Sequence, residues 1–339
     1  MTEGQLATET PPAHGRGRTG GLGVRPDNSH RLQVIAALRH PRPTKLNGME
    51  NGMRIGLLSF GPEEFATLHE TCVEAGHAPL VYAYSRSLRP RTATDDEAAR
   101  AARRITAALP EGVDLLLPGS SEGLGAALRG YHLDLVVCYG FSWRLPRSVL
   151  SIPRYGVINV HCSLLPKYRG PAPVLWAIRN GDAELGVTVH RMNEKFDAGP
   201  ILAQQAGVPL PDDVTPGRLW DGLAPALRAV VRRALCRVRD PEAGEPQATA
   251  GVSYAGLMEP EFFRLDTTKP ASEIHHQVRT CRFMGPQAAP VALIEGNRRR
   301  ILRTSLTPAD GWRLDCGDGP LWITASELVE SNGREERND

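Results

Sequence analysis

The chain has 339 residues, of which 41% are hydrophobic and 23% charged, with a formal net charge of +2 at pH 7. This length favours two domains with ordinary globular cores, and the small net charge gives no overall basic field for nucleic acid. The six cysteines are scattered and form no disulfide framework. Because no secretory signal or long apolar span is apparent, we expect a cytoplasmic protein that does not bind membranes.

Residues 1–52 are rich in Gly, Pro, Thr and Arg. A segment of this composition cannot bury enough apolar surface to offset the entropy lost on ordering. We therefore expect a disordered tail over residues 1–52.

From residue 53 onward, apolar strand-like runs alternate with helix-like segments. The expected strands are 53–61, 80–84, 113–117, 133–138 and 157–160, and the expected helices are 63–75 and 95–109. Such alternation predicts a parallel sheet with helices on both faces, in which ligands bind beyond the carboxyl ends of the strands. No Gly-x-Gly-x-x-Gly pattern follows the first strand, which argues against a dinucleotide site.

An amide and an imidazole stand two residues apart at the end of the last of these runs. Residues i and i+2 of a strand point to the same face, so Asn159 and His161 are expected to project together, with Val160 buried behind them. Taken alone, Asn-x-His at a strand end is more often a satisfied polar pair or a turn. Here the amide can bind an oxyanion while the imidazole moves a proton.

A second alternating run, 186–192, leads into a loop closed by Gly and Pro at 199–200. Asp197 lies in this loop. A carboxylate there can hold the tautomer of His161 and raise its basicity, although Asp before Ala-Gly is more often a turn former.

The segment from Gly156 to Gln204 resembles the folate-dependent (10-formyltetrahydrofolate) formyltransferases. This family includes methionyl-tRNA formyltransferase and the N-formyltransferases of small molecules and amino sugars. The pattern Asn-x-His-x-Ser-Leu-Leu-Pro-Lys-x-Arg-Gly stands at 159–170, and Asp-Ala-Gly follows at 197–199. The resemblance implies an α/β formyltransferase-type catalytic domain, with a doubly wound, mostly parallel sheet, followed by a small β-rich carboxy-terminal domain.

The resemblance also implies catalytic roles. Asn159 would donate its amide hydrogen to the formyl oxygen, His161 would move a proton from the attacking amine to the folate nitrogen, and Asp197 would tune His161. Cys162 alternates with His161 and should face away from the site as a small buried hydrophobe.

The implied cosubstrate is 10-formyltetrahydrofolate, and no metal is expected because the Cys and His residues lack paired ligand spacing. In relatives the pterin is held largely by main-chain groups, with residues 139–146 as a further wall of the slot. The residues predicted to contact folate are Ser163, Leu164, Leu165, Pro166, Asn193, Glu194, Lys195 and Phe196.

We predict a catalytic domain over 53–240, a Pro/Gly/Glu-rich linker over 241–252 and a small domain over 253–330. The helix expected at 219–238 carries several arginines. An RNA-facing stripe is one interpretation, and a solvated helix face is the more common one. The basic cluster at 298–303 could likewise face RNA. An exposed hairpin is the favoured interpretation.

The acceptor amine is the open point. The basic segment 85–92 lacks the Gly/Lys-rich run of the tRNA enzymes, and Val-Thr-Val-His-Arg-Met at 187–192 is more typical of relatives that act on small amines. We therefore predict N-formylation of a small metabolite, such as an amino sugar, an amino acid derivative or a biosynthetic intermediate. Formylation of initiator methionyl-tRNA is the alternative, and hydrolysis of formyltetrahydrofolate a further one.

Overall fold

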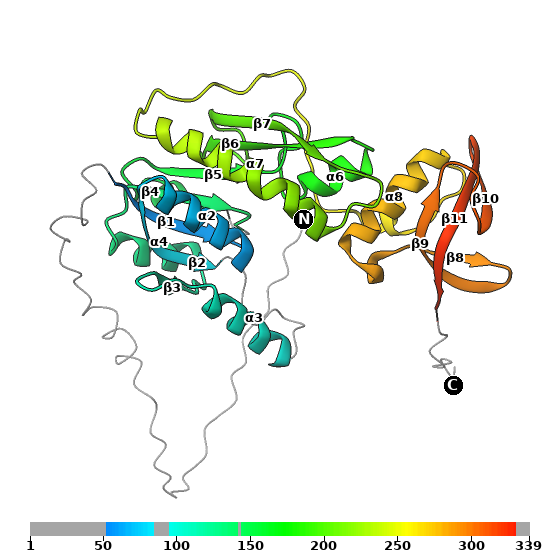
Figure 1. The fold of residues 1–339 in the computed structure, drawn as a ribbon. Coiled ribbons are helices and arrows are strands. Elements are labelled where there is room, and N and C mark those ends of the chain that lie inside the picture. The colour runs from blue at the N-terminus through cyan, green and yellow to red at the C-terminus, as the bar shows by residue number, and fades with distance from the viewer. Residues whose placement is uncertain (1–51, 85–94, 142–143, 330–339) are drawn as a thin grey trace, which may run out of the picture. The chain divides into compact units, whose positions relative to one another are not determined.

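The computed structural model describes residues 52–84, 95–141 and 144–329. The predicted tail therefore lies, apart from Gly52, outside the described residues, as does the whole of the basic segment 85–92. Figure 1 shows the order of the elements.

Seven strands form the first sheet, in the order β3-β2-β1-β4-β5-β6-β7. Their bounds are β1 (Arg54–Ser59), β2 (Ala78–Tyr84), β3 (Asp114–Leu116), β4 (Leu135–Tyr139), β5 (Val157–His161), β6 (Glu184–Arg191) and β7 (Ile201–Pro209). Strands β1 to β5 pair in parallel, whereas β6 and β7 are antiparallel additions at one edge. The mostly parallel sheet confirms the predicted fold class.

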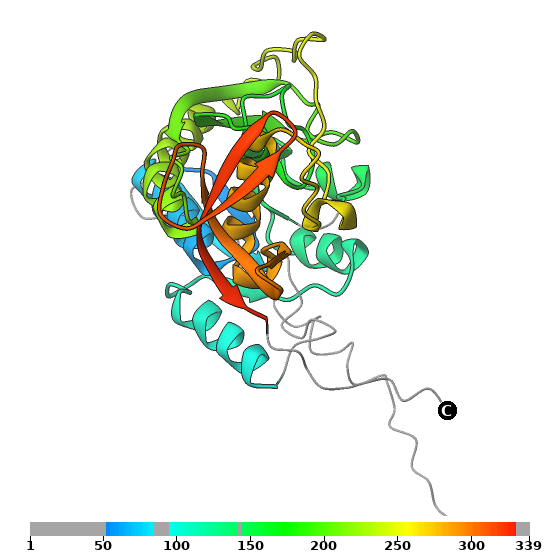
Figure 2. The same cartoon turned by 90° about the vertical axis from the view of Figure 1, so that its right-hand side faces the viewer.

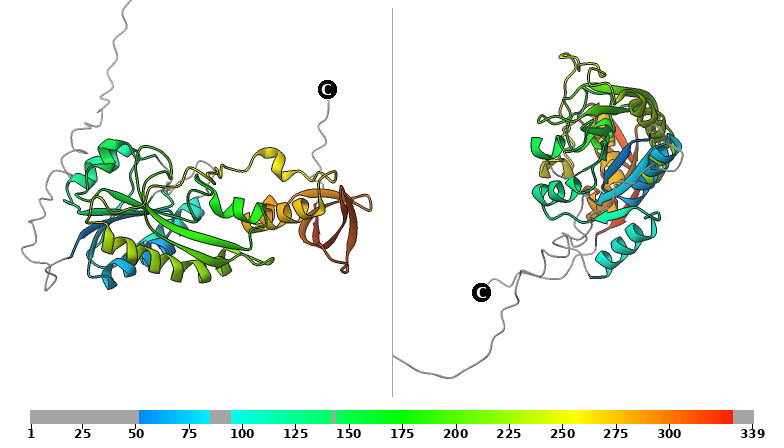
Figure 3. Two further views of the ribbon diagram at one scale, coloured as in Figure 1. Left: turned by 90° about the horizontal axis from the view of Figure 1, so that it is seen from above. Right: turned by 90° about the vertical axis from the view of Figure 1, so that its left-hand side faces the viewer.

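Helices pack on both faces of this sheet. They are α2 (Pro62–Glu74), α3 (Asp95–Ala107), α4 (Ser121–Arg129), α5 (Arg147–Leu150), α6 (Pro173–Arg179) and α7 (Pro216–Arg237). Consecutive residues of β1 point to opposite faces, so Leu57 joins the core under α2 and α7, while Leu58 joins the core under α4 and α5. The yellow-green helix α7 lies along the sheet in Figure 3, left.

The expected strands and helices of the first half all form, with bounds shifted by a few residues. Strand β7 was not predicted. Its sequence, Ile-Leu-Ala-Gln-Gln-Ala-Gly-Val-Pro, contains a glycine and two amides, and only two of its nine residues are fully buried because it is the edge of the sheet.

The chain after residue 259 forms a second, four-stranded antiparallel sheet beside a helix. Its elements are η1 (Pro260–Phe263), α8 (Ala271–Met284), η2 (Pro286–Ala288), β8 (Val291–Ile294), β9 (Asn297–Ser305), β10 (Trp312–Cys316) and β11 (Gly319–Leu328). Helix α8 packs against β9 and β11, which Figure 2 brings to the front in orange and red. A separate small β-rich module was predicted and is present, while the domain boundaries at 240 and 252 stay a prediction.

Candidate active site

The register of the sheet brings one row of polar side chains to the carboxyl end of the parallel strands. Cys138 of β4 is opposite Asn159 of β5, which is opposite His190 of β6. Asn159 and His161 share this face because they are two residues apart, and Val160 is buried on the other face. The site therefore lies where parallel α/β sheets bind ligands.

Asp197 reaches this row from the loop after β6. Its backbone has φ +48°, a left-handed conformation that Asp tolerates better than most residues. Gly199 is required two residues later, because a Cβ there would lie 1.8 Å from the carbonyl oxygen of Arg191. The Asp-Ala-Gly pattern thus describes a tight turn that aims a carboxylate back at β5.

The carboxylate of Asp197 contacts the amide of Asn159 and both imidazoles of the row. Its Oδ2 accepts the amide hydrogen of Gly170 at 2.8 Å and lies 3.7 Å from His161 Nδ1. Its Oδ1 lies 3.4 Å from both Asn159 Nδ2 and His190 Nε2. The two imidazoles are 6% and 2% exposed, and the carboxylate is 13% exposed. An amide donor, two imidazoles and a carboxylate are therefore gathered in a largely dry site.

Burial sets the protonation state of this cluster. It lowers the pKa of His161, and the charge of His190 acts in the same direction, while Asp197 and the carbonyl of Tyr168 oppose it. Burial works to raise the pKa of Asp197, but the hydrogen bond from His190, the charge of His161 and the Gly170 amide together lower it. His161 is thus a neutral base and Asp197 an anion at neutral pH.

Two members of this environment were missed by sequence reasoning. His190 was seen only as part of a strand, because its contact with Asn159 depends on the antiparallel register of β6. Gln247 lies in the predicted linker, yet its Nε2 donates to the carbonyls of Asp197 and Gly199 at 2.7 and 2.9 Å. Its Oε1 accepts two hydrogen bonds from Arg169. No local pattern predicts such a contact.

Cys162 lies where the alternation predicts. It is buried on the far face, 3.2 Å from the hydroxyl of Tyr139, and burial raises the pKa of its thiol to about 11. A thiol in that state is a poor nucleophile.

The residues predicted to contact folate fall into two groups. Those of the first group are Ser163, Leu164, Leu165 and Pro166. The main chain of this turn is bonded inside the protein: Thr188 Oγ1 bridges the carbonyl of Ser163 and the amide of Leu165, and Gln204 donates to the carbonyl of Leu165. Leu164 is exposed and lines, with Ser163, a cavity of about 240 Å³.

The second group, Asn193 to Phe196, forms the exposed loop before Asp197. Its Phe196 side chain is 60% exposed. Arg144, from the predicted wall 139–146, donates to the carbonyl of Glu194 at 2.7 Å and lies over the ring of Phe196. The loop and the wall are therefore in contact, whereas residues 142–143 of the wall lie outside the described residues.

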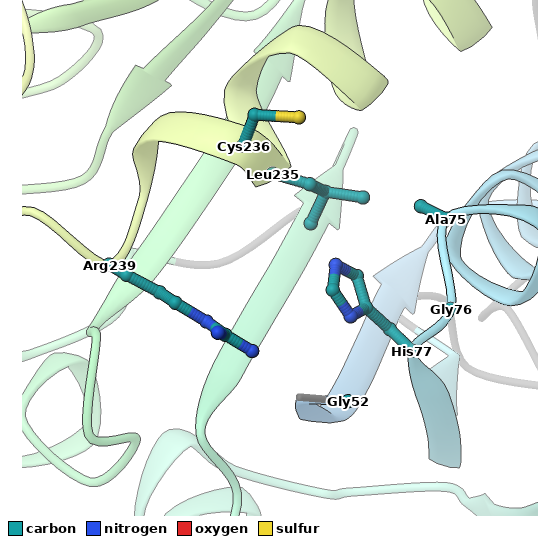
Figure 4. A pocket seen from close by; sticks show the side chains of 7 residues that line it. All are labelled: Gly52, Ala75, Gly76, His77, Leu235, Cys236 and Arg239. Carbon is teal, nitrogen blue, oxygen red and sulfur yellow. The ribbon is translucent and has the colours of Figure 1, made fainter. Parts of the chain in front are cut away.

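A larger cavity, about 400 Å³, lies at the amino end of the sheet (Figure 4). It is lined by Gly52, Ala75, Gly76, His77, Leu235, Cys236 and Arg239. Since Gly52 precedes β1 and Asn159 is near the end of the parallel strand β5, this cavity is at the opposite edge from the polar row. It is not part of the candidate active site.

The arginines of α7 are used within the protein. Arg228 pairs with Glu70 of α2, and Arg232 pairs with Glu74 at 2.7 Å. Arg233 and Arg237 donate to main-chain carbonyls of β7. These arginines therefore link α7 to α2 and to the edge strand β7.

Within the described residues, no group of His, Cys, Asp and Glu is arranged to hold a metal ion. No helix in the same part of the chain is long and apolar enough to cross a membrane.

Comparison with known proteins gives the class. Residues 53–230 match the family described as Formyl transferase. The chain is 34% identical to a methionyl-tRNA formyltransferase of Pseudomonas paraeruginosa, over 79% of this chain and 89% of that protein. It is 32% identical to one of Sinorhizobium fredii, over 83% and 94%. The chain belongs to the formyl transferase family and is a transferase of one-carbon groups.

Solved structures agree on the fold. A likely sugar N-formyltransferase from Mycobacterium tuberculosis has a TM-score of 0.54 at 18% identity, with 76% of this chain and 99% of that chain covered. HypX from Aquifex aeolicus, in complex with tetrahydrofolic acid, has a TM-score of 0.54 at 19% identity, with 82% of this chain but only 44% of that chain covered.

Proposed function

We propose that this protein moves the formyl group of 10-formyltetrahydrofolate to a primary amine of a small metabolite. The observation that carries the proposal is the convergence of Asn159, His161 and Asp197 at the end of β5. An oxyanion donor beside a buried, neutral imidazole and a fixed carboxylate is what acyl transfer to an amine requires.

Each group has a role in that transfer. As the amine attacks, negative charge develops on the formyl oxygen, and the amide of Asn159 donates to it. The attacking nitrogen loses a proton, which His161 accepts at Nδ1, the ring nitrogen that faces Asp197. The anion of Asp197 stabilises the imidazolium until the proton passes to the leaving nitrogen.

The fit of the folate donor rests on the loop before Asp197. The exposed ring of Phe196 and the neighbouring guanidinium of Arg144 offer a planar surface beside the site. Because the main chain of the turn 163–166 is already bonded internally, Asn193 to Phe196 are the stronger candidates for folate contacts. The name of the HypX complex, which includes tetrahydrofolic acid, supports a folate donor in this fold.

A small acceptor is favoured over tRNA by the contacts that arginines of α7 and of the second sheet make within the protein. Phosphate binding needs available cations, but Arg228, Arg232 and Arg237 contact protein groups. In the predicted basic cluster, Arg299 lies over Trp312, and Arg300 lies 3.6 Å from Glu327.

Initiator methionyl-tRNA is the second candidate acceptor. It is favoured by the names of the curated relatives, which match over most of their length. Hydrolysis of formyltetrahydrofolate is the third candidate activity, because the same polar groups can activate water.

The test is an incubation with 10-formyltetrahydrofolate and, in parallel, with initiator methionyl-tRNA or a pool of amino sugars and amino acids. Release of tetrahydrofolate and product mass are followed together. We expect a gain of one formyl group on a small amine. Formylation of tRNA alone would establish the second candidate, and formate release without an amine would establish hydrolysis.

A further inference from the structure

Two exposed aromatic side chains adjoin the loop and the turn that hold the Asp197 carboxylate. Among the residues that the structure describes, the exposed aromatic side chains are Phe196, at 60%, and Tyr254, at 62%. Phe196 immediately precedes Asp197 and is accounted for by the proposed folate contacts. Tyr254 belongs to the segment that leads to the second sheet, and nothing in the proposed reaction uses it.

The ring of Tyr254 lies against Gly170. A Cβ on Gly170 would come within 2.7 Å of Tyr254 Cε2 and 3.0 Å of its Cζ, so a residue without a side chain is needed for the ring to lie this close. The amide of Gly170 donates to Asp197 Oδ2 at 2.8 Å, and the carbonyl of Tyr168 lies 2.7 Å from His161 Nε2. A single glycine therefore separates the exposed ring from the catalytic carboxylate.

The backbone on both sides of Tyr254 is bonded to the catalytic domain. The amide of Arg169 donates to the carbonyl of Ser253 at 2.9 Å, and the amide of Ala255 donates to the carbonyl of Arg169 at 2.6 Å. The hydroxyl of Ser253 accepts the amide hydrogen of Tyr168 at 2.8 Å. Tyr254 is thus presented to solvent from a fixed backbone, and a ring held in this way offers contact area at a small cost in conformational entropy.

A second glycine meets the opposite edge of the ring. A Cβ on Gly256 would lie 3.5 Å from Tyr254 Cε1 and 3.8 Å from its Cδ1. The carbonyl of Gly256 is itself fixed, because it accepts a hydrogen bond from Trp176 Nε1 at 2.8 Å. Both edges of the ring therefore pack near main chain, while most of the side chain stays accessible to a ligand.

The cationic side chains nearest to this ring in the turn are paired within the protein. Arg169 donates through Nε and Nη2 to Gln247 Oε1 at 3.0 and 2.6 Å. Lys167 Nζ lies 2.7 Å from a carboxylate oxygen of Asp182. A ligand on Tyr254 is therefore held by apolar contact with the ring rather than by an ion pair with these two residues.

We propose that Tyr254 is a specificity-determining residue that binds the acceptor, selecting an amine carried on or beside a ring whose apolar face stacks on the tyrosine. This inference rests on the proposed formyl transfer. Phe196 and Arg144 lie on the loop and wall assigned to folate, so the ring beside Gly170 serves the amine. Stacking of this kind acts equally on bound substrate and transition state, so it lowers KM for the amine without changing kcat.

The first test compares Tyr254→Ala and Tyr254→Phe in steady-state kinetics with the amine identified from the acceptor pool. Loss of the ring should raise KM for the amine about tenfold, while kcat and the KM for 10-formyltetrahydrofolate stay at their wild-type values. Phenylalanine keeps the ring and should restore the KM for the amine. An alanine variant with an unchanged KM for the amine, or with a raised KM for folate alone, would overturn the proposal.

The matched control is Leu293→Ala. Leu293 is also a large apolar side chain, 71% exposed, but it lies on β8 of the second sheet. Its substitution should change neither KM. If it raised the KM for the amine as much as Tyr254→Ala, the effect would not belong to the ring beside Gly170, and the proposal would fail.

The second test is independent of turnover. The chain has seven tyrosines, so full-length protein containing fluorotyrosine gives few ¹⁹F NMR signals, and Tyr254→Phe identifies that of Tyr254. Glucosamine, its open-chain reduction product glucosaminitol and an aminodeoxythymidine are each titrated. We expect the Tyr254 signal to shift with one or both ring amines and to stay in place with glucosaminitol. The two ring amines distinguish a sugar face from a flat base.

A Tyr254 signal that neither ring amine moves, or that glucosaminitol moves equally, would contradict the inference. If a ring amine shifts this signal but no amine is formylated, the binding role of Tyr254 stands and the proposed function fails. If an amine is formylated while the signal does not respond to the ring amines, the proposed function stands and the role of Tyr254 fails.

Discussion

Two of the buried histidines that lie against carboxylates, His161 and His275, have opposite surroundings. His161 faces Asp197, which is largely buried between two imidazoles, whereas His275 faces Asp212, whose side chain is 71% exposed. Asp212 is also bonded by Arg279, and the main-chain oxygen of Asp212 accepts from Arg282. A carboxylate buried among a backbone amide, a side-chain amide and two imidazoles retains electrostatic influence over a proton, while an exposed one near two arginines links α8 to the loop after β7.

The largest expected effect comes from Asp197→Asn. An amide keeps the shape of the side chain but removes the charge that stabilises protonated His161. We expect kcat to fall on the order of 10³–10⁴-fold, by analogy with the loss of an orienting carboxylate in hydrolases. Steady-state kinetics would measure this, with circular dichroism to check folding. If Asp212→Asn lowered kcat as much, the distinction between the two carboxylates would be lost.

Gln247→Leu tests how the buried carboxylate is held. The substitution removes the two hydrogen bonds that Gln247 gives to the loop around Asp197 and leaves Arg169 without its acceptor. We expect kcat to fall about tenfold to a hundredfold through misplacement of Asp197. Urea denaturation should show a loss of about 1–3 kcal/mol.

The matched control for this variant is Gln287→Leu, since Gln287 is exposed on η2. It should change neither quantity. An equal loss of activity in both variants would mean that the effect of Gln247 is not specific to the Asp197 loop.

Asp212→Asn tests whether the exposed carboxylate contributes to stability in a pH-dependent way. Burial works to raise the pKa of Asp212, but His275 and the charges of Arg279 and Arg282 lower it overall. A lowered pKa in the folded state contributes stability above the unfolded value near about 4, and this is lost as pH falls through the folded value.

The thermal unfolding temperature of Asp212→Asn should therefore lie below that of wild type at neutral pH, and the gap should close at acid pH. Asp310→Asn, at an exposed position of the β9–β10 loop, serves as control. A difference in unfolding temperature that stays constant between about pH 3 and pH 7, a range that includes the ordinary carboxyl pKa, would rule out this electrostatic contribution of Asp212.

The smallest effect is expected for Arg232→Ala, which breaks an ion pair exposed at both ends. Such pairs contribute about 0.2–1 kcal/mol, so the unfolding free energy should fall by no more than that and the loss should shrink in high salt. Urea denaturation at two salt concentrations measures it. Activity on a small amine should be unchanged, whereas a drop in binding of methionyl-tRNA would favour the second candidate acceptor.

Local periodicity accounts for what could be predicted. The alternation of strands and helices predicts the parallel sheet, and the period of two places Asn159 and His161 on one face. Strand β7 is amphipathic only in part and at the edge, so its sequence gives little signal.

The rest of the site depends on contacts between distant segments. His190 meets Asn159 through the register of two antiparallel strands, and Gln247 reaches Asp197 from a segment that reads as a connector. Asp197 was predicted from its motif, but its position between two imidazoles required the folded chain.

The most direct test of the central claim is to supply 10-formyltetrahydrofolate labelled with ¹³C in the formyl group, together with an amine identified from the acceptor pool. Wild type and Asp197→Asn are compared by ¹³C NMR. The label is predicted to appear as an N-formyl group on the amine with wild type, and to remain on the folate with the variant. Label found in formate while amine is present, or equal transfer by both proteins, would contradict the account.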